Sequence, residues 1–185
     1  QRGRSRTVYH LSGTEMATLA SGSVTSEADE EALLVDRIVD ASGLYRLSLT
    51  TRGNRPRILI KNRGAVVEAS SAQQHLHPMH RSFLYFYVPR GTREFAIVTK
   101  PEEPLYLTVY GPHDAAEPVY PRTGQHATIF MEHLITVPEG ADGTAWRMRV
   151  DGEDKKIFLL GIPPFLSSHY ERLLLPAGEE PRKLD

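Results

Sequence analysis

Three histidines lie close together in the sequence and could bind a metal ion. His75, His77 and His80 occur within six residues, and His75 and His77 would point to the same side of an extended chain. Neutral imidazole is a ligand for zinc and copper. The segment also contains Pro78, which is typical of a loop, and the spacing reveals no fourth ligand. Two interpretations stay open: a zinc site, and a loop whose histidines are simply hydrated.

The metal hypothesis has an enzymatic version, a metal-dependent enzyme with a cupin-like jelly-roll fold. Such a site places two histidines one residue apart on a strand, as at His75 and His77, with a carboxylate and a third histidine further along. His126 or His133, together with Glu132, could complete this set. Pro78 argues against a strand here, because proline removes a hydrogen-bond donor from the ladder.

Other chemical motifs are weak or missing. Ser167 and His169 are near neighbours, but no Gly-x-Ser-x-Gly turn exists to expose a nucleophile. The turns at residues 139–143 and 151–154 carry carboxylates that suit calcium, although Asp-Gly turns need no ion. The sequence has no cysteine, phosphate loop or dinucleotide fingerprint. We therefore expect a protein that is not an enzyme and needs no cofactor, with calcium or zinc as the alternative.

Tyrosines offer a different chemistry, because a flat ring can stack on the apolar face of a sugar. Tyr106 and Tyr110 fall on the side of an expected strand opposite to Leu105 and Leu107. Tyr120 lies in a proline-flanked segment and could join them. We predict Tyr106, Tyr110 and Tyr120 as carbohydrate-binding residues.

Alternation of apolar and polar residues predicts the elements that position these side chains. The expected strands are residues 45–50, 57–61, 83–88, 94–100, 105–110, 129–137, 146–151 and 156–160. Phe83–Val88 is apolar on both faces and is expected to be a central strand, and Trp146 is expected to face the core. Residues 66–82 and 112–127 are expected to be loops, and residues 27–40 fit either a helix or a strand.

These strands predict an all-β, antiparallel, jelly-roll-like sandwich with at most one short helix, formed as a single domain by residues 1–185. Residues 1–7 are expected to be a flexible basic arm and residues 177–185 a polar tail. The net charge of −1 gives no overall field that would attract nucleic acid. No apolar run reaches the ~18 residues of a membrane-spanning helix. Because the chain begins at Gln1, we expect it to be part of a larger protein.

Four phrases of the sequence carry a family resemblance. They are Phe86–Thr92, Thr108–Pro112, Val137–Trp146 and Gly161–Leu166. Together they cover roughly residues 83–168, and they resemble β-sandwich accessory domains found late in large secreted bacterial proteins, often beside glycoside-hydrolase-like modules. The resemblance implies a jelly-roll-like sandwich, a non-catalytic role and an extracellular or periplasmic location. It implies no particular site residues.

The leading hypothesis is therefore a non-catalytic accessory module of a secreted bacterial protein. Its expected partners are a polysaccharide and a neighbouring catalytic domain of the same parent chain, with no nucleic acid and no membrane span. The alternatives are the cupin-like metal enzyme and a structural spacer without a ligand.

Overall fold

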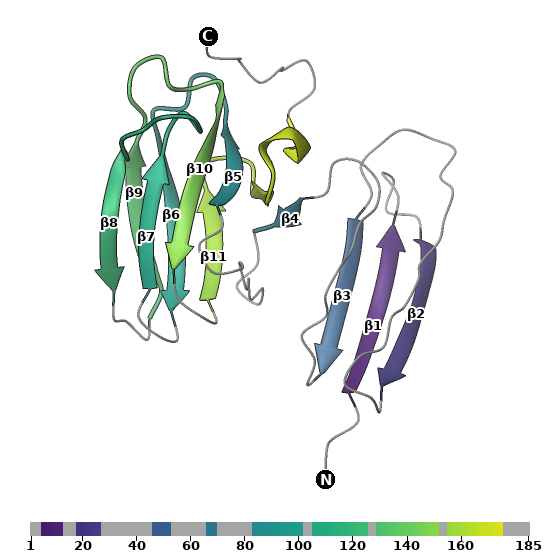
Figure 1. Ribbon diagram of the computed structural model, residues 1–185. Coiled ribbons are helices and arrows are strands. Elements are labelled where there is room, and N and C mark those ends of the chain that lie inside the picture. Colours follow the sequence, from purple (N-terminus) through teal and green to yellow (C-terminus); the bar gives the residue numbers. More distant parts are fainter. Residues whose placement is uncertain are drawn as a thin grey trace. The chain divides into compact units, whose positions relative to one another are not determined.

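Strands dominate the described part of this chain. The computed structural model describes residues 5–12, 18–26, 46–52, 66–69, 83–101, 105–125, 129–151 and 155–175. Contacts along the chain divide it into two units, Gln1–Leu59 and Ile60–Asp185. Each unit is described by itself (Figure 1), and the expectation of one domain over residues 1–185 stays a prediction.

The first unit contains a three-stranded antiparallel sheet. Its strands are β1 (Ser5–Ser12), β2 (Thr18–Ser26) and β3 (Arg46–Arg52), in the order β2-β1-β3. β3 confirms the strand predicted at residues 45–50. β1 begins at Ser5, so residues 5–7 of the expected basic arm belong to a strand. Residues 27–40, which fitted either a helix or a strand, lie outside the described residues.

The second unit contains the remaining elements. They are β4 (Val67–Glu68), β5 (Phe83–Val88), β6 (Glu94–Pro101), β7 (Leu105–Tyr110), β8 (Tyr120–Gln125), β9 (Met131–Thr136), β10 (Thr144–Asp151), β11 (Lys155–Leu160), β12 (Phe165–Leu166) and a 3₁₀ turn, η1 (Tyr170–Arg172). A four-stranded sheet has the order β5-β10-β7-β8 and a three-stranded sheet the order β11-β6-β9. β12 pairs with β4 in a small third sheet. All these pairings are antiparallel.

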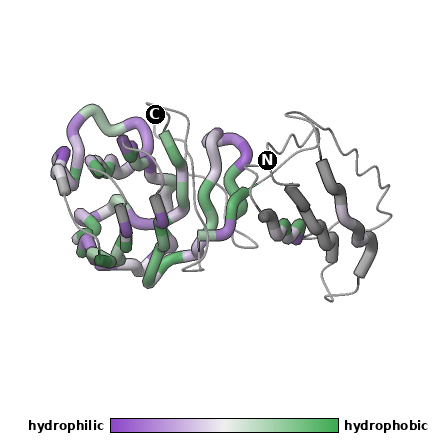
Figure 2. Tube along the Cα trace, turned by 90° about the horizontal axis from the view of Figure 1, so that it is seen from below, coloured by the Kyte–Doolittle hydropathy of each residue, from purple (hydrophilic) through white to green (hydrophobic). Residues whose placement is uncertain are grey.

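Alternate residues of the two larger sheets form one hydrophobic core. Buried and more exposed residues alternate along β9 and much of β10, and both hydrophobic and hydrophilic residues occur in this unit (Figure 2). Trp146 on β10 is fully buried, and its ring meets that of Phe95 on β6 edge to face at 5.3 Å. The core also includes Phe86, Ile97, Leu107, Val109, Ile135, Met148, Ile157 and Leu159. The expected all-β antiparallel sandwich and the core position of Trp146 are confirmed.

The position of β5 differs from the expectation. Phe86 and Val88 are fully buried and Tyr87 is nearly so, as predicted for a strand covered on both faces. β5 nevertheless stands at the edge of its sheet rather than at the centre. Its outer edge is covered by a bridge between Tyr85 and Ser167, in the segment that follows β12. A local segment, rather than a further long strand, therefore pairs with the backbone N–H and C=O of Tyr85 at this edge.

β8 lies inside the segment 112–127 that was expected to be a loop. Pro121 and Gly124 interrupt its alternation, which is why the pattern did not reveal it. β8 is an edge strand, where a proline without an N–H group can be accommodated. A Cβ atom at Gly124 would lie 2.7 Å from Cε1 of Tyr106, so glycine makes room for that ring. The short strand β4 likewise lies inside the expected loop 66–82.

Candidate ligand-binding face

The outer surface of the four-stranded sheet gathers aromatic and charged side chains. Because Leu105, Leu107 and Val109 of β7 face the core, the residues between them face outward. The antiparallel register sets Arg147, Arg149 and Asp151 of β10 directly opposite Tyr110, Thr108 and Tyr106 of β7. Side chains in such cross-strand pairs are neighbours. We call this surface the arginine–tyrosine face; it comprises Phe83, Tyr106, Thr108, Tyr110, Arg122, Arg147, Arg149 and Asp151.

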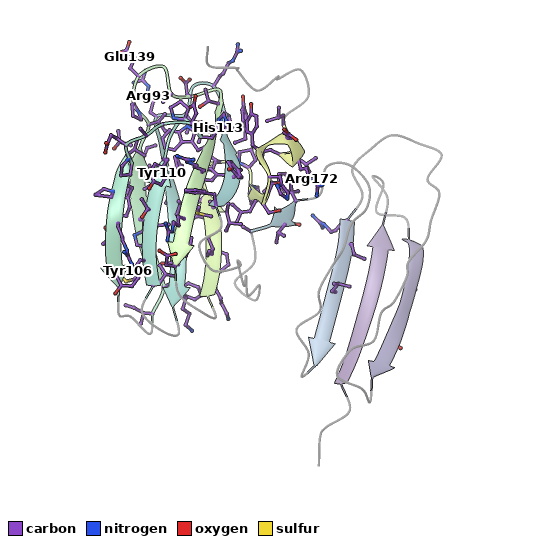
Figure 3. All side chains as sticks on the ribbon, in the orientation of Figure 1. Arg93, Tyr106, Tyr110, His113, Glu139 and Arg172 are labelled. Carbon is purple, nitrogen blue, oxygen red and sulfur yellow. The ribbon has the colours of Figure 1, made fainter. Side chains whose placement is uncertain are left out.

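A shallow hollow lies within this face. Its volume is about 210 Å³, and it is lined by Thr108, Tyr110, Pro118, Arg122, Arg149 and Asp151. Pockets for drug-sized ligands occupy roughly 300–1,000 Å³, so this one suits a single small polar group or one unit of a longer chain. Figure 3 shows Tyr106 and Tyr110 at different heights along the same sheet. The hollow is thus part of a surface that extends along β7.

An ion pair fixes one wall of the hollow. Nε of Arg149 lies 3.1 Å from Oδ1 of Asp151, and the two side chains are 36% and 23% exposed. At such exposure the pair contributes at most about 1 kcal/mol to folding. Its structural effect is to hold the guanidinium group of Arg149 against the sheet, beside Thr108.

A second arginine holds the ring of Tyr110 in place. The guanidinium carbon of Arg147 lies 4.4 Å from the ring centroid of Phe83 and 4.7 Å from that of Tyr110. The two rings themselves meet edge to face at 5.8 Å. Nη2 of Arg147 donates a hydrogen bond to the carbonyl of Ala115, which anchors the loop before β8. Nε of Arg147 is buried without a hydrogen-bond partner in the described part of the chain, so the ring contacts offset part of that cost.

The third arginine of the face, Arg122, contacts the ring of Tyr106. The guanidinium carbon of Arg122 on β8 lies 4.3 Å from the centroid of the Tyr106 ring, which is 38% exposed. A cation–π contact at an exposed site contributes about 0.5–1 kcal/mol. The contact is therefore weak enough for a ligand to replace it.

Tyr120 does not join Tyr106 and Tyr110. It packs against the core, and its hydroxyl lies 3.0 Å from Nδ1 of His133. Nε2 of the same histidine lies 3.0 Å from Oγ1 of Thr99. His133 is only 3% exposed, and burial holds the pKa of His133 below its ordinary value. These contacts connect β8 to β6 and β9, which is a structural arrangement at the interior of the sandwich.

The proposed metal ligands cannot be assembled from the described residues. His75, His77, His80 and His126 lie outside the ranges that the structure describes. His133 is buried and Glu132, its neighbour on β9, is exposed on the opposite face of the strand. Among the described residues no three His, Cys, Asp or Glu side chains are grouped to hold a metal ion. Both the metal and the cupin-like hypotheses stay predictions.

Asp142 and Ser167, two of the residues singled out for chemistry, bond to the backbone in this structure, whereas residues 152–154 lie outside the described ranges. Oδ2 of Asp142 accepts a hydrogen bond from the N–H of Gly91 at 2.7 Å and so joins two turns. The hydroxyl of Ser167 bonds the carbonyl of His169 rather than its ring.

A separate aromatic cluster lies at the β5 edge of the same sheet. The ring of His113 stacks on Tyr170 with a centroid distance of 4.0 Å and an angle of 6°, and both meet Tyr85 edge to face. Burial, and to a lesser extent the negative charge of Asp114, raise the pKa of Tyr170. The cluster ties the segment after β7 to η1 and to β5.

The sequence pattern missed the charged part of the arginine–tyrosine face. Arg147 and Arg149 alternate with Trp146 and Met148, so their outward position was visible in the pattern. Their alignment with Tyr110 and Thr108 depends on strand pairing between segments about forty residues apart. Only the register brings them together.

Comparisons with known proteins identify no relative. No protein family, curated protein or solved structure matches this chain. No helix in the described ranges has the length and apolar character needed to cross a membrane. The function is therefore argued from the arginine–tyrosine face itself.

Proposed function

We propose that this protein is a non-catalytic accessory module that binds a polysaccharide on its arginine–tyrosine face. The observation that carries this proposal is the hollow between Tyr110, Thr108, Arg122 and Arg149, with the exposed ring of Tyr106 on the same strand. The family resemblance of residues 83–168 agrees with such a role, outside the cell or in the periplasm of a bacterium.

The donor and acceptor groups of the face match what a sugar requires. Arginine N–H groups donate, the carboxylate of Asp151 accepts, and the hydroxyls of Thr108 and Tyr110 do both. Sugar hydroxyls need all three kinds of partner, while their ring C–H groups pack on aromatic rings. Tyr106 and Tyr110 are four residues apart on β7, which separates their Cα atoms by about 13 Å. This length suits several linked sugar units rather than one.

Binding fits the face better than cleavage does. Glycoside hydrolysis uses two carboxylates on either side of the scissile bond. Among the described residues that line the hollow, Asp151 is the one carboxylate, and Arg149 holds it in an ion pair. The described lining of the hollow therefore supplies one carboxylate where that reaction uses two.

The test is a binding survey with matched variants of the 185-residue chain. Wild type, Tyr106→Ala and Tyr110→Ala are compared by affinity electrophoresis in gels that contain different polysaccharides. Phe130→Ala is the control. Phe130 is an aromatic residue just before β9 of the three-stranded sheet, and its exposed fraction of 45% is similar to the 38% of Tyr106. We expect at least one polysaccharide to retard wild type and Phe130→Ala but neither tyrosine variant. Retardation by no polysaccharide would favour the spacer hypothesis.

A second candidate, packing against a neighbouring domain, is supported by the outer side of the three-stranded sheet. Register places Leu160, Ala96 and Leu134 side by side across β11, β6 and β9. The exposed apolar residues there are Phe130 (45%), Leu134 (56%) and Leu160 (49%). Apolar residues grouped on a surface commonly mark a protein contact. Hydrogen exchange at β9 and β11 should be slower in the parent protein than in this chain alone; equal rates would argue against such packing.

A further inference from the structure

We infer that the polysaccharide bound by the arginine–tyrosine face is acidic, with a carboxylate on its sugar units. This inference rests on the proposed function and adds the chemical class of the ligand. Within the described residues of the face, Arg122, Arg147 and Arg149 carry three positive charges and Asp151 one negative charge, a net of +2. The whole chain has a net charge of −1. The net charge of these residues is thus opposite in sign to that of the whole chain.

The two arginines that line the hollow can receive a carboxylate. Asp151 engages Nε of Arg149, and the described contacts include no hydrogen bond to its two Nη groups. Arg122 lies across the hollow on β8, with its guanidinium group stacked on Tyr106. Guanidinium groups bind carboxylates through paired N–H donors. The hydroxyl of Thr108, between them on β7, can donate a further hydrogen bond.

The position of Arg122 favours an acidic sugar over a neutral one. Its guanidinium group covers the ring that a sugar would stack on. A neutral sugar must displace this cation from the ring and offers no charge in return. A sugar carboxylate draws the cation to itself, so the stacking surface of Tyr106 is uncovered while Arg122 gains an ionic partner. Stacking and ion pairing are thus coupled through one side chain.

Arg147 contributes by position rather than by direct contact. Its guanidinium group is enclosed between Phe83 and Tyr110, and its Nη2 is bonded to Ala115. It holds the Tyr110 ring at the edge of the hollow and adds a positive potential behind it. Rigid walls reduce the ordering cost of binding.

Single-stranded nucleic acid also combines anionic groups with bases that stack on aromatic rings. Non-specific nucleic-acid binding needs many contacts between basic side chains and phosphates. The net charge of −1 on the whole chain does not favour such contacts. The small hollow accommodates one carboxylate at a time. An acidic polysaccharide therefore fits the site better than nucleic acid does, and nucleic acid is included in the test.

The experiment compares polymers with and without charged carboxylates on the same sugar backbone. Polygalacturonate, alginate and polyglucuronate are each compared with their fully methyl-esterified forms, by isothermal titration calorimetry with the full 185-residue chain. We expect at least one acid form to bind about tenfold or more tightly than its ester. Raising the salt from 0.1 to 1 M shortens the Debye length from about 10 to about 3 Å and should weaken this binding.

Variants locate the effect. Arg122→Gln and Arg149→Gln should each lose most of the preference for the acid form. Arg172→Gln, at an exposed arginine of η1 away from the hollow, should keep it. Equal binding of acid and ester forms that is lost in Tyr106→Ala would overturn the acidic ligand but leave the carbohydrate proposal standing. If the chain binds neither these polymers nor any neutral polysaccharide, both the acidic ligand and the carbohydrate proposal are overturned. If oligo-dT binds more tightly than any polysaccharide, the ligand is a single-stranded nucleic acid and the acidic-polysaccharide proposal is overturned.

Discussion

Replacing Trp146 with alanine should remove a large part of the stability of the second unit. The indole ring is fully buried and contacts the rings of Phe86 and Phe95 between the two sheets. Its Nε1 donates a hydrogen bond to the carbonyl of Ala141 at 2.9 Å. Truncating a buried tryptophan to alanine costs about 3–5 kcal/mol. Domains are typically stable by about 5–15 kcal/mol, so the loss is a major fraction of the total.

A second substitution tests the same packing from the opposite side. A Cβ atom at Gly111 would collide with the indole ring of Trp146, so Gly111→Ala should overpack the core at a cost of about 1–3 kcal/mol. Removing the indole makes room for the added methyl group. The double variant should therefore be more stable than the sum of the two single effects implies, by about 1–2 kcal/mol.

Urea denaturation followed by circular dichroism measures these free energies, because Trp146 is the only tryptophan and every variant that carries Trp146→Ala lacks its fluorescence. Ile129→Ala, at a side chain that is 69% exposed, is the control and should change stability by no more than about 0.5 kcal/mol. A Trp146→Ala variant within 1 kcal/mol of wild type, or strict additivity with Gly111→Ala, would refute this account of the core.

Three further predictions concern the site and its support. Arg147→Met should release the Tyr110 ring and weaken polysaccharide binding by about threefold to tenfold, measured by calorimetry, while Arg147→Lys restores less than half of the loss. His133 has a pKa below 6.5 in the folded chain, so the unfolded chain takes up the proton first as the pH falls. The free energy of unfolding should therefore decrease below about pH 6.5 by up to about 1.4 kcal/mol per pH unit, and His133→Gln should lack this component in urea titrations at pH 5 to 7. Gly124→Ala should push the Tyr106 ring off the sheet and lower the affinity for the polysaccharide, while the free energy of unfolding changes by no more than about 1 kcal/mol. An affinity equal to that of wild type would contradict the placement of that ring.

The alternation rule predicted the sandwich and half of the candidate site. Leu105, Leu107 and Val109 alternate cleanly, so the outward position of Tyr106 and Tyr110 could be predicted from β7 alone. The same rule placed Trp146 inward. These successes arise because the period of two is a local property of a strand with one buried face.

The rest of the site depends on pairing that the sequence pattern does not encode. Pro121 and Gly124 obscured β8, so neither the inward position of Tyr120 nor the outward position of Arg122 could be predicted. The partner of His133 was also unpredictable, because its hydrogen bonds reach Thr99 and Tyr120 on two other strands. Strand order and register are set by the packing of the whole unit.

The most direct test of the proposed function is to map the bound ligand by NMR. A polyuronate oligosaccharide is titrated into the ¹⁵N-labelled chain, and amide shifts are followed along every strand of the second unit. We predict the largest changes at residues 106–110 of β7, 122–124 of β8 and 147–151 of β10, with little change on β6, β9 and β11. Shifts centred on β6, β9 and β11, or no shifts with any acidic or neutral oligosaccharide, would contradict the arginine–tyrosine face as the binding site.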